Sequence, residues 1–196
     1  MPWKQVIAGA ILVRDGLPWV VSNTDMTIPT PSGVGPGNGT LVKLVADYSG
    51  RPPTVAGKPE TPLFEETLAR VGGDRPLMVG DRLDTDIEGA HRMGWESLLV
   101  LTGVTGVREL VAARPHERPS YIGLDLRDLE APHGVAEGSD TGWALGGWLA
   151  EVDGGELLVR GEGSPQDWWR VVASAAWEHL DTHGGEVGTA RLGQPR

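Results

Sequence analysis

The most constraining feature of the sequence is an alternation of helix-like and strand-like patterns between Thr40 and Leu101. Apolar residues recur at helical spacing in three stretches, and short apolar runs between them have the length of buried strands. These runs are Thr54–Ala56, Leu77–Val79 and Ser97–Leu101. Strands that alternate with helices pair in parallel and are covered on both faces. The pattern therefore predicts an α/β fold with a Rossmann-like parallel sheet.

Apolar stripes predict which side of each helix faces the core, because residues three and four apart share a helical face. The stripes are Trp3, Ile7, Ala10 and Ile11 in residues 1–16, then Leu41, Leu44, Val45 and Tyr48, then Phe64, Leu68 and Val71. A further helix that ends at Gly94 is expected to begin with a capping box formed by Thr85 and Glu88.

The flanks of this region have a different organisation. Trp19–Ser22 is expected to be a strand that opens into a loop rich in proline and glycine, Asn23–Gly39. Beyond Leu129, a linker leads to a small α+β unit with a hairpin of residues 148–152 and 156–160. A helix from Ser164 follows, and its tryptophans at helical spacing are expected to lie in a core.

Composition excludes several classes of protein. The net charge of −10 disfavours nonspecific nucleic-acid binding, which needs lysine and arginine to neutralise phosphates. No apolar run is long enough for a membrane span, and the first residues lack the pattern of a signal peptide. The absence of cysteine excludes disulfides and thiolate metal sites. We therefore expect a cytoplasmic protein that acts on small molecules, without nucleic acid or membrane as partners.

Charged residues follow two of the predicted strands. Lys58 comes after Thr54–Ala56, and Asp81 comes after Leu77–Val79. Ligands of open parallel sheets gather beyond the carboxyl ends of the strands, so Lys58 and Asp81 are expected to face one crevice. Asp84 and Asp86 lie close by, where a metal ion would relieve their repulsion, although acidic residues also favour the start of a helix. A cation beside carboxylates suits a phosphate dianion with Mg²⁺.

Two segments, residues 55–64 (VAGKPETPLF) and 77–90 (LMVGDRLDTDIEGA), resemble the haloacid dehalogenase (HAD) superfamily. Within it they resemble subfamily IIA, the sugar-phosphate, p-nitrophenyl-phosphate and pyridoxal-phosphate phosphatases. The segments 99–104, 22–25 and 36–39 fit the same pattern, and the resemblance covers roughly residues 5–130. It implies hydrolysis of small phosphate monoesters with Mg²⁺ as cofactor, through an aspartyl-phosphate.

The resemblance also implies roles for particular residues. Lys58 corresponds to the lysine that holds the charges of nucleophile and phosphate together, with a catalytic and a substrate-binding role. Asp81 corresponds to the catalytic Mg²⁺ ligand, and Asp86 to a second metal-binding aspartate. Asn23, Thr24 and Asp25 fall in the end of the cap domain, whose loop selects the substrate.

The family's nucleophile motif, D-x-D-G, has no counterpart in the sequence. Its one echo is Asn23-x-Asp25-x-Thr27, in which an asparagine could not act as the nucleophile. We therefore expect the C-terminal portion of a phosphatase that is inactive alone. The sheet would lack a central strand, so a partner, a second copy or the C-terminal unit is expected to cover the exposed edge.

The expected organisation has three parts: a remnant of the cap in residues 1–32, the C-terminal part of the hydrolase core in 33–131, and the unit of 139–196. Two alternatives to a phosphatase remain. One is a catalytically silent binding or regulatory protein that retains the metal and anion site. The other is a phosphorylated receiver-type signalling domain, which is disfavoured because Lys58 precedes Asp81 here.

Overall fold

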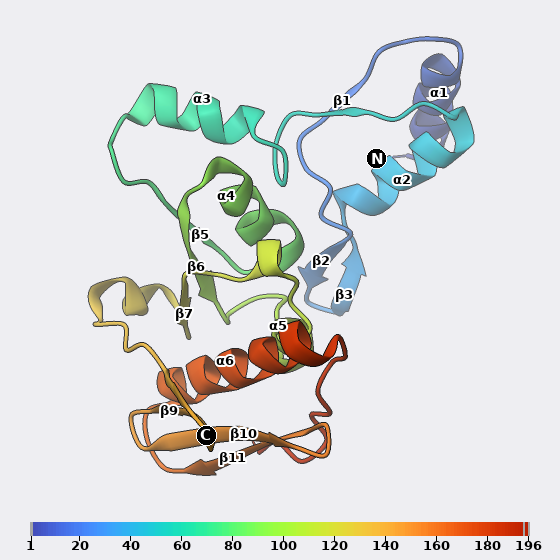
Figure 1. Ribbon diagram of the computed structural model, residues 1–196. Helices are drawn as coiled ribbons and strands as arrows, with labels where there is room; N and C mark the ends of the chain where they lie inside the picture. The colour runs from blue at the N-terminus through green and yellow to red at the C-terminus, as the bar shows by residue number, and fades with distance from the viewer. Residues whose placement is uncertain (1, 194, 196) are drawn as a thin grey trace.

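The computed structural model describes residues 2–193 and 195 and is a mixed α/β structure with parallel sheets (Figure 1). Three parallel strands form its centre: β5 (Leu77–Gly80), β6 (Glu96–Val100) and β7 (Tyr121–Gly123), in the order β5-β6-β7. The middle strand is buried from its second residue onward. Met1 and the last residues of the predicted C-terminal unit, Gln194 and Arg196, lie outside the described part.

A second pair of parallel strands lies apart from these three. β1 (Val20–Val21) pairs with β4 (Thr54–Val55), and the two form a sheet of their own. The sequence predicted one parallel sheet in which consecutive strands are neighbours. Instead, β4 and β5 are not hydrogen-bonded to each other in the described structure, and β5 is an edge strand.

Helices connect these strands in the predicted order. They are α2 (Asn38–Ser49), α3 (Pro62–Val71), α4 (Glu88–Met93) and α5 (Val107–Val111), with two short 3-10 helices, η2 (Pro115–Glu117) and η3 (Leu126–Glu130). The predicted capping box at Thr85 is wrong, because Thr85 lies inside a π-helical turn, η1 (Leu83–Ile87), that leads directly into α4. Its hydroxyl donates to Asp25 and so does not cap a helix. π-helical turns of this kind occur frequently at functional sites.

The segment predicted as the loop Asn23–Gly39 contains a hairpin of β2 (Thr27–Thr30) and β3 (Gly33–Pro36). It lies between the core and a helical pair formed by α1 (Trp3–Arg14) and α2 (Figure 1). The predicted apolar stripe of α1 is only partly buried: Ala10 is covered, while Trp3, Ile7 and Ile11 are exposed. Leu44 and Tyr48 of α2 are exposed as well.

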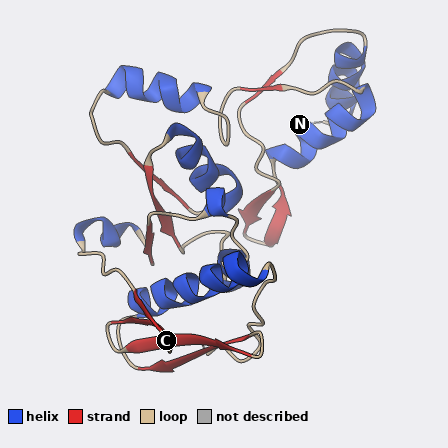
Figure 2. Cartoon of the chain, viewed as in Figure 1, coloured by secondary structure: helices blue, strands red, loops and turns tan. Residues whose placement is uncertain are grey.

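The C-terminal unit is an antiparallel sheet packed on a long helix, α6 (Pro165–His183), as Figure 2 shows. Its strands are β8 (Glu137–Ser139), β9 (Gly142–Leu145), β10 (Trp148–Asp153) and β11 (Glu156–Gly161). The predicted hairpin and helix are confirmed, and Ser164 caps α6 by accepting a hydrogen bond from the Asp167 amide. Trp168 lies in the core of this unit and Trp169 packs against it. Among the described residues, no helix has the length and apolar character needed to cross a bilayer.

Candidate phosphate and metal site

The backbone just before Lys58 approaches another segment of the chain closely. A Cβ atom on Gly57 would lie 2.1 Å from the carbonyl oxygen of Ser22, so only glycine fits there. The Thr24 amide donates to the Lys58 carbonyl at 3.3 Å, which joins the loop after β1 to the turn after β4. The Lys58 ammonium group is therefore held beside the residues that follow β5.

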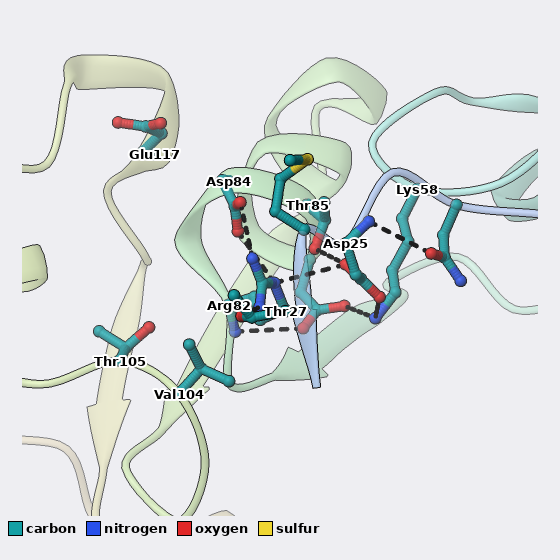
Figure 3. A network of polar contacts seen from close by, with 12 residues as sticks. Asp25, Thr27, Lys58, Arg82, Asp84, Thr85, Val104, Thr105 and Glu117 are labelled. Carbon is teal, nitrogen blue, oxygen red and sulfur yellow. Dashed lines mark hydrogen bonds and ion pairs between the residues drawn. The ribbon is translucent and has the colours of Figure 1, made fainter. Parts of the chain in front are cut away.

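The Lys58 ammonium group forms ion pairs with two carboxylates, and Figure 3 labels Lys58 and one of the two, Asp25. Its Nζ lies 2.8 Å from Asp86 Oδ1 and 3.4 Å from Asp25 Oδ2. Burial lowers the pKa of Lys58, but the hydrogen bond and the charge of Asp86, together with Asp25, outweigh burial and raise it. Lys58 is therefore a cation over the whole physiological pH range, as an anion-binding residue must be.

Asp86 is fixed on both of its oxygens. One oxygen binds Lys58, and the other accepts from the backbone amides of Asp81 and Arg82, each at 3.2 Å. Asp86 is only 2% exposed, and a Cβ atom on Gly80 would lie 2.3 Å from the Cβ atom of Asp86. This carboxylate positions Lys58 and the turn after β5, and it has no oxygen turned to solvent.

Asp81 is fixed on one oxygen only. Its Oδ2 accepts from the Val104 amide at 2.9 Å, and its backbone carbonyl accepts from the Thr105 hydroxyl at 2.6 Å. Gly103 makes this approach possible, since a Cβ there would lie 1.7 Å from Asp81 Oδ2. Among the described residues, Oδ1 of Asp81 accepts no hydrogen bond. That oxygen is available to a hard cation, which takes carboxylate oxygens as ligands.

Arg82 links the core to the β2–β3 hairpin. It is 8% exposed, donates to both oxygens of Asp84 at 3.1 and 2.8 Å, and donates to the Thr27 hydroxyl at 2.9 Å. Its Nε lies 3.4 Å from Asp25 Oδ1, and the Thr85 hydroxyl donates to the same oxygen at 2.6 Å. Both oxygens of Asp84 thus accept hydrogen bonds from Arg82.

Sequence reasoning missed Arg82, Thr85 and Thr27 as members of this cluster. The available signal was Arg82 itself, a single cation inside the acidic segment 81–86. The predicted residues Asn23, Thr24 and Asp25 lie in the same region but differ in role. Asn23 accepts from the Asp25 amide with its side chain and shapes the turn, whereas only Asp25 among the three contacts Lys58 with its side chain.

The two predicted metal ligands, Asp81 and Asp86, differ in how many of their carboxylate oxygens are available. Among the described residues, one side-chain oxygen of Asp81 accepts no hydrogen bond. Both side-chain oxygens of Asp86 accept hydrogen bonds, one from Lys58 and the other from backbone amides. Among the described residues, the one set of three acidic or histidine side chains close enough to share an ion is Glu88, His116 and Glu117. Arg92 and Arg114 already pair with those two glutamates, so we assign no metal there.

Comparison with known proteins shows what this chain resembles. Residues 55–129 match the family model of HAD-hydrolase-like proteins, a range that contains Lys58 and the whole acidic segment 81–86. The D-glycerol 3-phosphate phosphatase of Mycobacterium tuberculosis is 41% identical over 186 residues, which cover 90% of this chain and 51% of that protein. The chain thus spans about half the length of this curated relative.

Solved structures show the same relationship. The glycerol phosphate phosphatase of Mycobacterium tuberculosis in complex with magnesium is 42% identical, with a TM-score of 0.73 over 91% of this chain and 53% of that one. A thermostable NPPase from Geobacillus stearothermophilus is 33% identical, with a TM-score of 0.54 over 62% of this chain and 48% of its own. The chain belongs to the haloacid dehalogenase superfamily, within subfamily IIA.

Proposed function

We propose that this chain forms the lysine- and Mg²⁺-binding part of a phosphatase that hydrolyses small phosphate monoesters. The observation that supports the proposal is that Asp86 binds Lys58 Nζ with one oxygen and the Asp81 backbone amide with the other, while the Asp81 side chain keeps one oxygen without a described hydrogen bond. The relatives' names support the substrate class: one acts on D-glycerol 3-phosphate, and its structure holds magnesium.

In this proposal each residue has a distinct task. Lys58 neutralises one charge of the phosphate, and Asp86 holds Lys58 in place. Asp81 would hold Mg²⁺ through its free oxygen, and the ion would neutralise further phosphate charge. Residues 1–32 would correspond to the end of a cap, with Asp25 and the β2–β3 hairpin near the substrate. Residues 33–131 would form the C-terminal part of the hydrolase core.

The chain is proposed to bind phosphate without turning over esters by itself. Hydrolysis through an aspartyl-phosphate needs one carboxylate to attack phosphorus and another to manage the proton of the leaving group. In the crevice Asp86 is bound by Lys58 and amides, and Asp84 by Arg82. The alternative, a silent binding protein with the same site, is favoured by Asn23-x-Asp25-x-Thr27, the one echo of the nucleophile motif, which has an asparagine in place of the first aspartate.

Two measurements test the proposal. Calorimetric titration with inorganic phosphate should show binding that depends on Mg²⁺ and is lost with a chelator. Phosphate release from p-nitrophenyl phosphate and D-glycerol 3-phosphate should be absent for the chain alone. Lack of any Mg²⁺-dependent phosphate binding would overturn the proposal. Chelator-sensitive turnover that disappears in Asp81→Asn would show that a nucleophile is present, and Asp25 would be the first residue to substitute.

A further inference from the structure

The loop that holds Asp81 continues directly into a very short helix. Val104 donates its amide to Asp81 Oδ2 at 2.9 Å, and Thr105 donates its hydroxyl to the Asp81 carbonyl at 2.6 Å. The helix that follows, α5, begins at Val107 and has only five residues, too few for a helix that is stable by itself. The position of the loop therefore depends on what covers α5.

Much of the cover of α5 comes from the C-terminal helix α6, against which it packs (Figure 1). Val107 and Val111 belong to the apolar cluster of the C-terminal unit, together with Trp168 of α6. Leu110 is 0% exposed and lies in a second cluster that contains Ala173 of α6. Each apolar residue that α5 buries thus shares a cluster with side chains of α6.

Two polar contacts hold the end of α5, and both involve α6. Trp177 of α6 donates its indole Nε1–H to the Leu110 carbonyl at 2.8 Å. Arg118 donates to the Ala113 carbonyl at 3.1 Å and forms two hydrogen bonds of 2.7 Å with Asp181 of α6. The guanidinium carbon of Arg118 also lies 5.4 Å from the centre of the Trp177 ring. Trp177 therefore joins α6 directly to the backbone of α5.

We propose that the C-terminal unit positions the candidate metal ligand. Trp177 holds α5, α5 fixes the loop of residues 103–105, and this loop orients the carboxylate of Asp81. Trp177 is then a positioning residue, because it acts on Asp81 only through α5 and the loop. The inference rests on the proposed function in one respect, since Asp81 is taken as the residue that would hold Mg²⁺.

A purely structural role for Trp177 is the competing account, and Trp143 of β9 provides the matched control. Both tryptophans are half-buried in contact with the C-terminal unit. Trp143 also donates its indole Nε1–H at 2.8 Å, but its acceptor is the Glu178 side chain and not the backbone of α5. A structural role would make the two positions equivalent, whereas a positioning role affects Asp81 from Trp177 alone.

The test compares Trp177→Phe with Trp143→Phe in the full chain, since phenylalanine keeps an aromatic ring and removes the indole donor. Hydrogen exchange of the Val104 and Thr105 amides, followed by NMR without Mg²⁺, should quicken at least about threefold in Trp177→Phe and stay unchanged in Trp143→Phe. Amides of β10 report any general loss of stability in the same spectra.

Calorimetric titration with Mg²⁺ is the second readout. Groups that hydrogen-bond a metal ligand are worth about 10–100-fold in metal affinity, and Trp177 acts one step further out. Trp177→Phe should therefore weaken Mg²⁺ binding at least about threefold, and Trp143→Phe should leave it unchanged. Asp181→Asn is a further variant at an exposed side chain. It loosens the Arg118 contact to α6 and should quicken the same loop amides even if Trp177→Phe does not fold.

The outcomes separate this inference from the proposed function. Loop amides that keep the wild-type exchange rate in Trp177→Phe and Asp181→Asn would overturn the inference, and so would equal quickening in Trp143→Phe. Unchanged Mg²⁺ affinity in Trp177→Phe would overturn it as well. Absence of Mg²⁺ binding by the wild-type chain would reject the proposed function. Selective quickening in that case would still sustain support of the Asp81 loop by α6.

Discussion

The C-terminal unit and the N-terminal part of the chain use apolar residues in opposite ways. In the C-terminal unit, Trp168 is 1% exposed and packs with β10 and β11 side chains in one closed core. In the N-terminal part, Trp3 is 61% exposed, and α1, α2 and α3 all present large apolar side chains to solvent. Among the described residues, none of the exposed large apolar side chains lies beyond Val135.

This difference shows that an apolar stripe identifies the apolar face of a helix. It does not show whether another part of the chain packs against that face and buries it. The stripes of α1, α2 and α6 have the same helical spacing. Only α6 meets a full antiparallel sheet from its own sequence neighbourhood. The helices α1 and α2 pack against each other, and several of their large apolar side chains remain exposed.

The largest expected effect is on the closed core. Trp168→Ala should lower the free energy of unfolding by about 3–5 kcal/mol, because a buried aromatic side chain leaves a cavity. Trp3→Ala should change it by no more than about 0.5 kcal/mol, as for an exposed side chain. Denaturant unfolding followed by circular dichroism measures both. Similar losses for the two variants would mean that α1 belongs to a closed core.

The next effect concerns the cation of the site. Lys58→Ala should weaken Mg²⁺-dependent binding of inorganic phosphate by about 1.5–3 kcal/mol, the value of a hydrogen bond to a charged group. Lys43→Ala is the matched control, since Lys43 forms an exposed surface pair with Asp47. Calorimetry on both variants decides the matter. An unchanged phosphate affinity in Lys58→Ala would remove this residue from the site.

A smaller effect separates two neighbouring aspartates. Asp81→Asn should weaken Mg²⁺ binding about tenfold or more, roughly 1.4 kcal/mol, because it removes the charge behind a free carboxylate oxygen. Asp84→Asn should cost less, because Asp84 is already paired with Arg82. Titration of both variants with Mg²⁺ is the measurement. Equal losses, or a larger loss for Asp84→Asn, would place the ion elsewhere.

The smallest expected effect is on the pH dependence of stability. It concerns η2, which lies in the sequence between the N-terminal part and the C-terminal unit. The hydrogen bond from Arg114 lowers the pKa of Glu117 below its usual value, against the opposing effect of burial. A lowered folded-state pKa contributes stability that is present above the unfolded pKa of about 4.3 and is lost as pH falls through the folded value. Arg114→Ala should therefore flatten the acid side of the stability curve. NMR titration of Glu117 should show its pKa rising, and an unchanged pKa would contradict the assignment.

Much of the fold could be predicted from local patterns. The strands β5 and β6, the hairpin of β10 and β11, and the helix from Ser164 lie within a residue or two of their expected places. Each of them is specified by residues close in sequence: an apolar run, a glycine turn or a capping serine. The position of Lys58 beside an aspartate of the acidic segment was also expected, although its partner is Asp86 and not Asp81.

The features that were not predicted depend on contacts between residues far apart in the sequence. The spacing of apolar residues carries no information about such contacts. Thr85 has the spacing of a capping residue, but its hydroxyl binds Asp25, 60 positions away. Arg82 donates a hydrogen bond to Thr27, 55 positions away, and so contacts the β2–β3 hairpin, which the sequence predicted as a loop. The separation of β4 from β5 is a property of the whole sheet, and no local signal in either strand encodes it.

The contact between Asp25 and Lys58 limits how tightly Lys58 can bind an anion. An incoming phosphate must share or replace a carboxylate that is tethered to the same chain and already lies 3.4 Å from the ammonium group. The apparent affinity for an anion then falls by the fraction of time that Asp25 occupies the lysine. Asp25 would thus act as an internal competitor of any anion that binds Lys58.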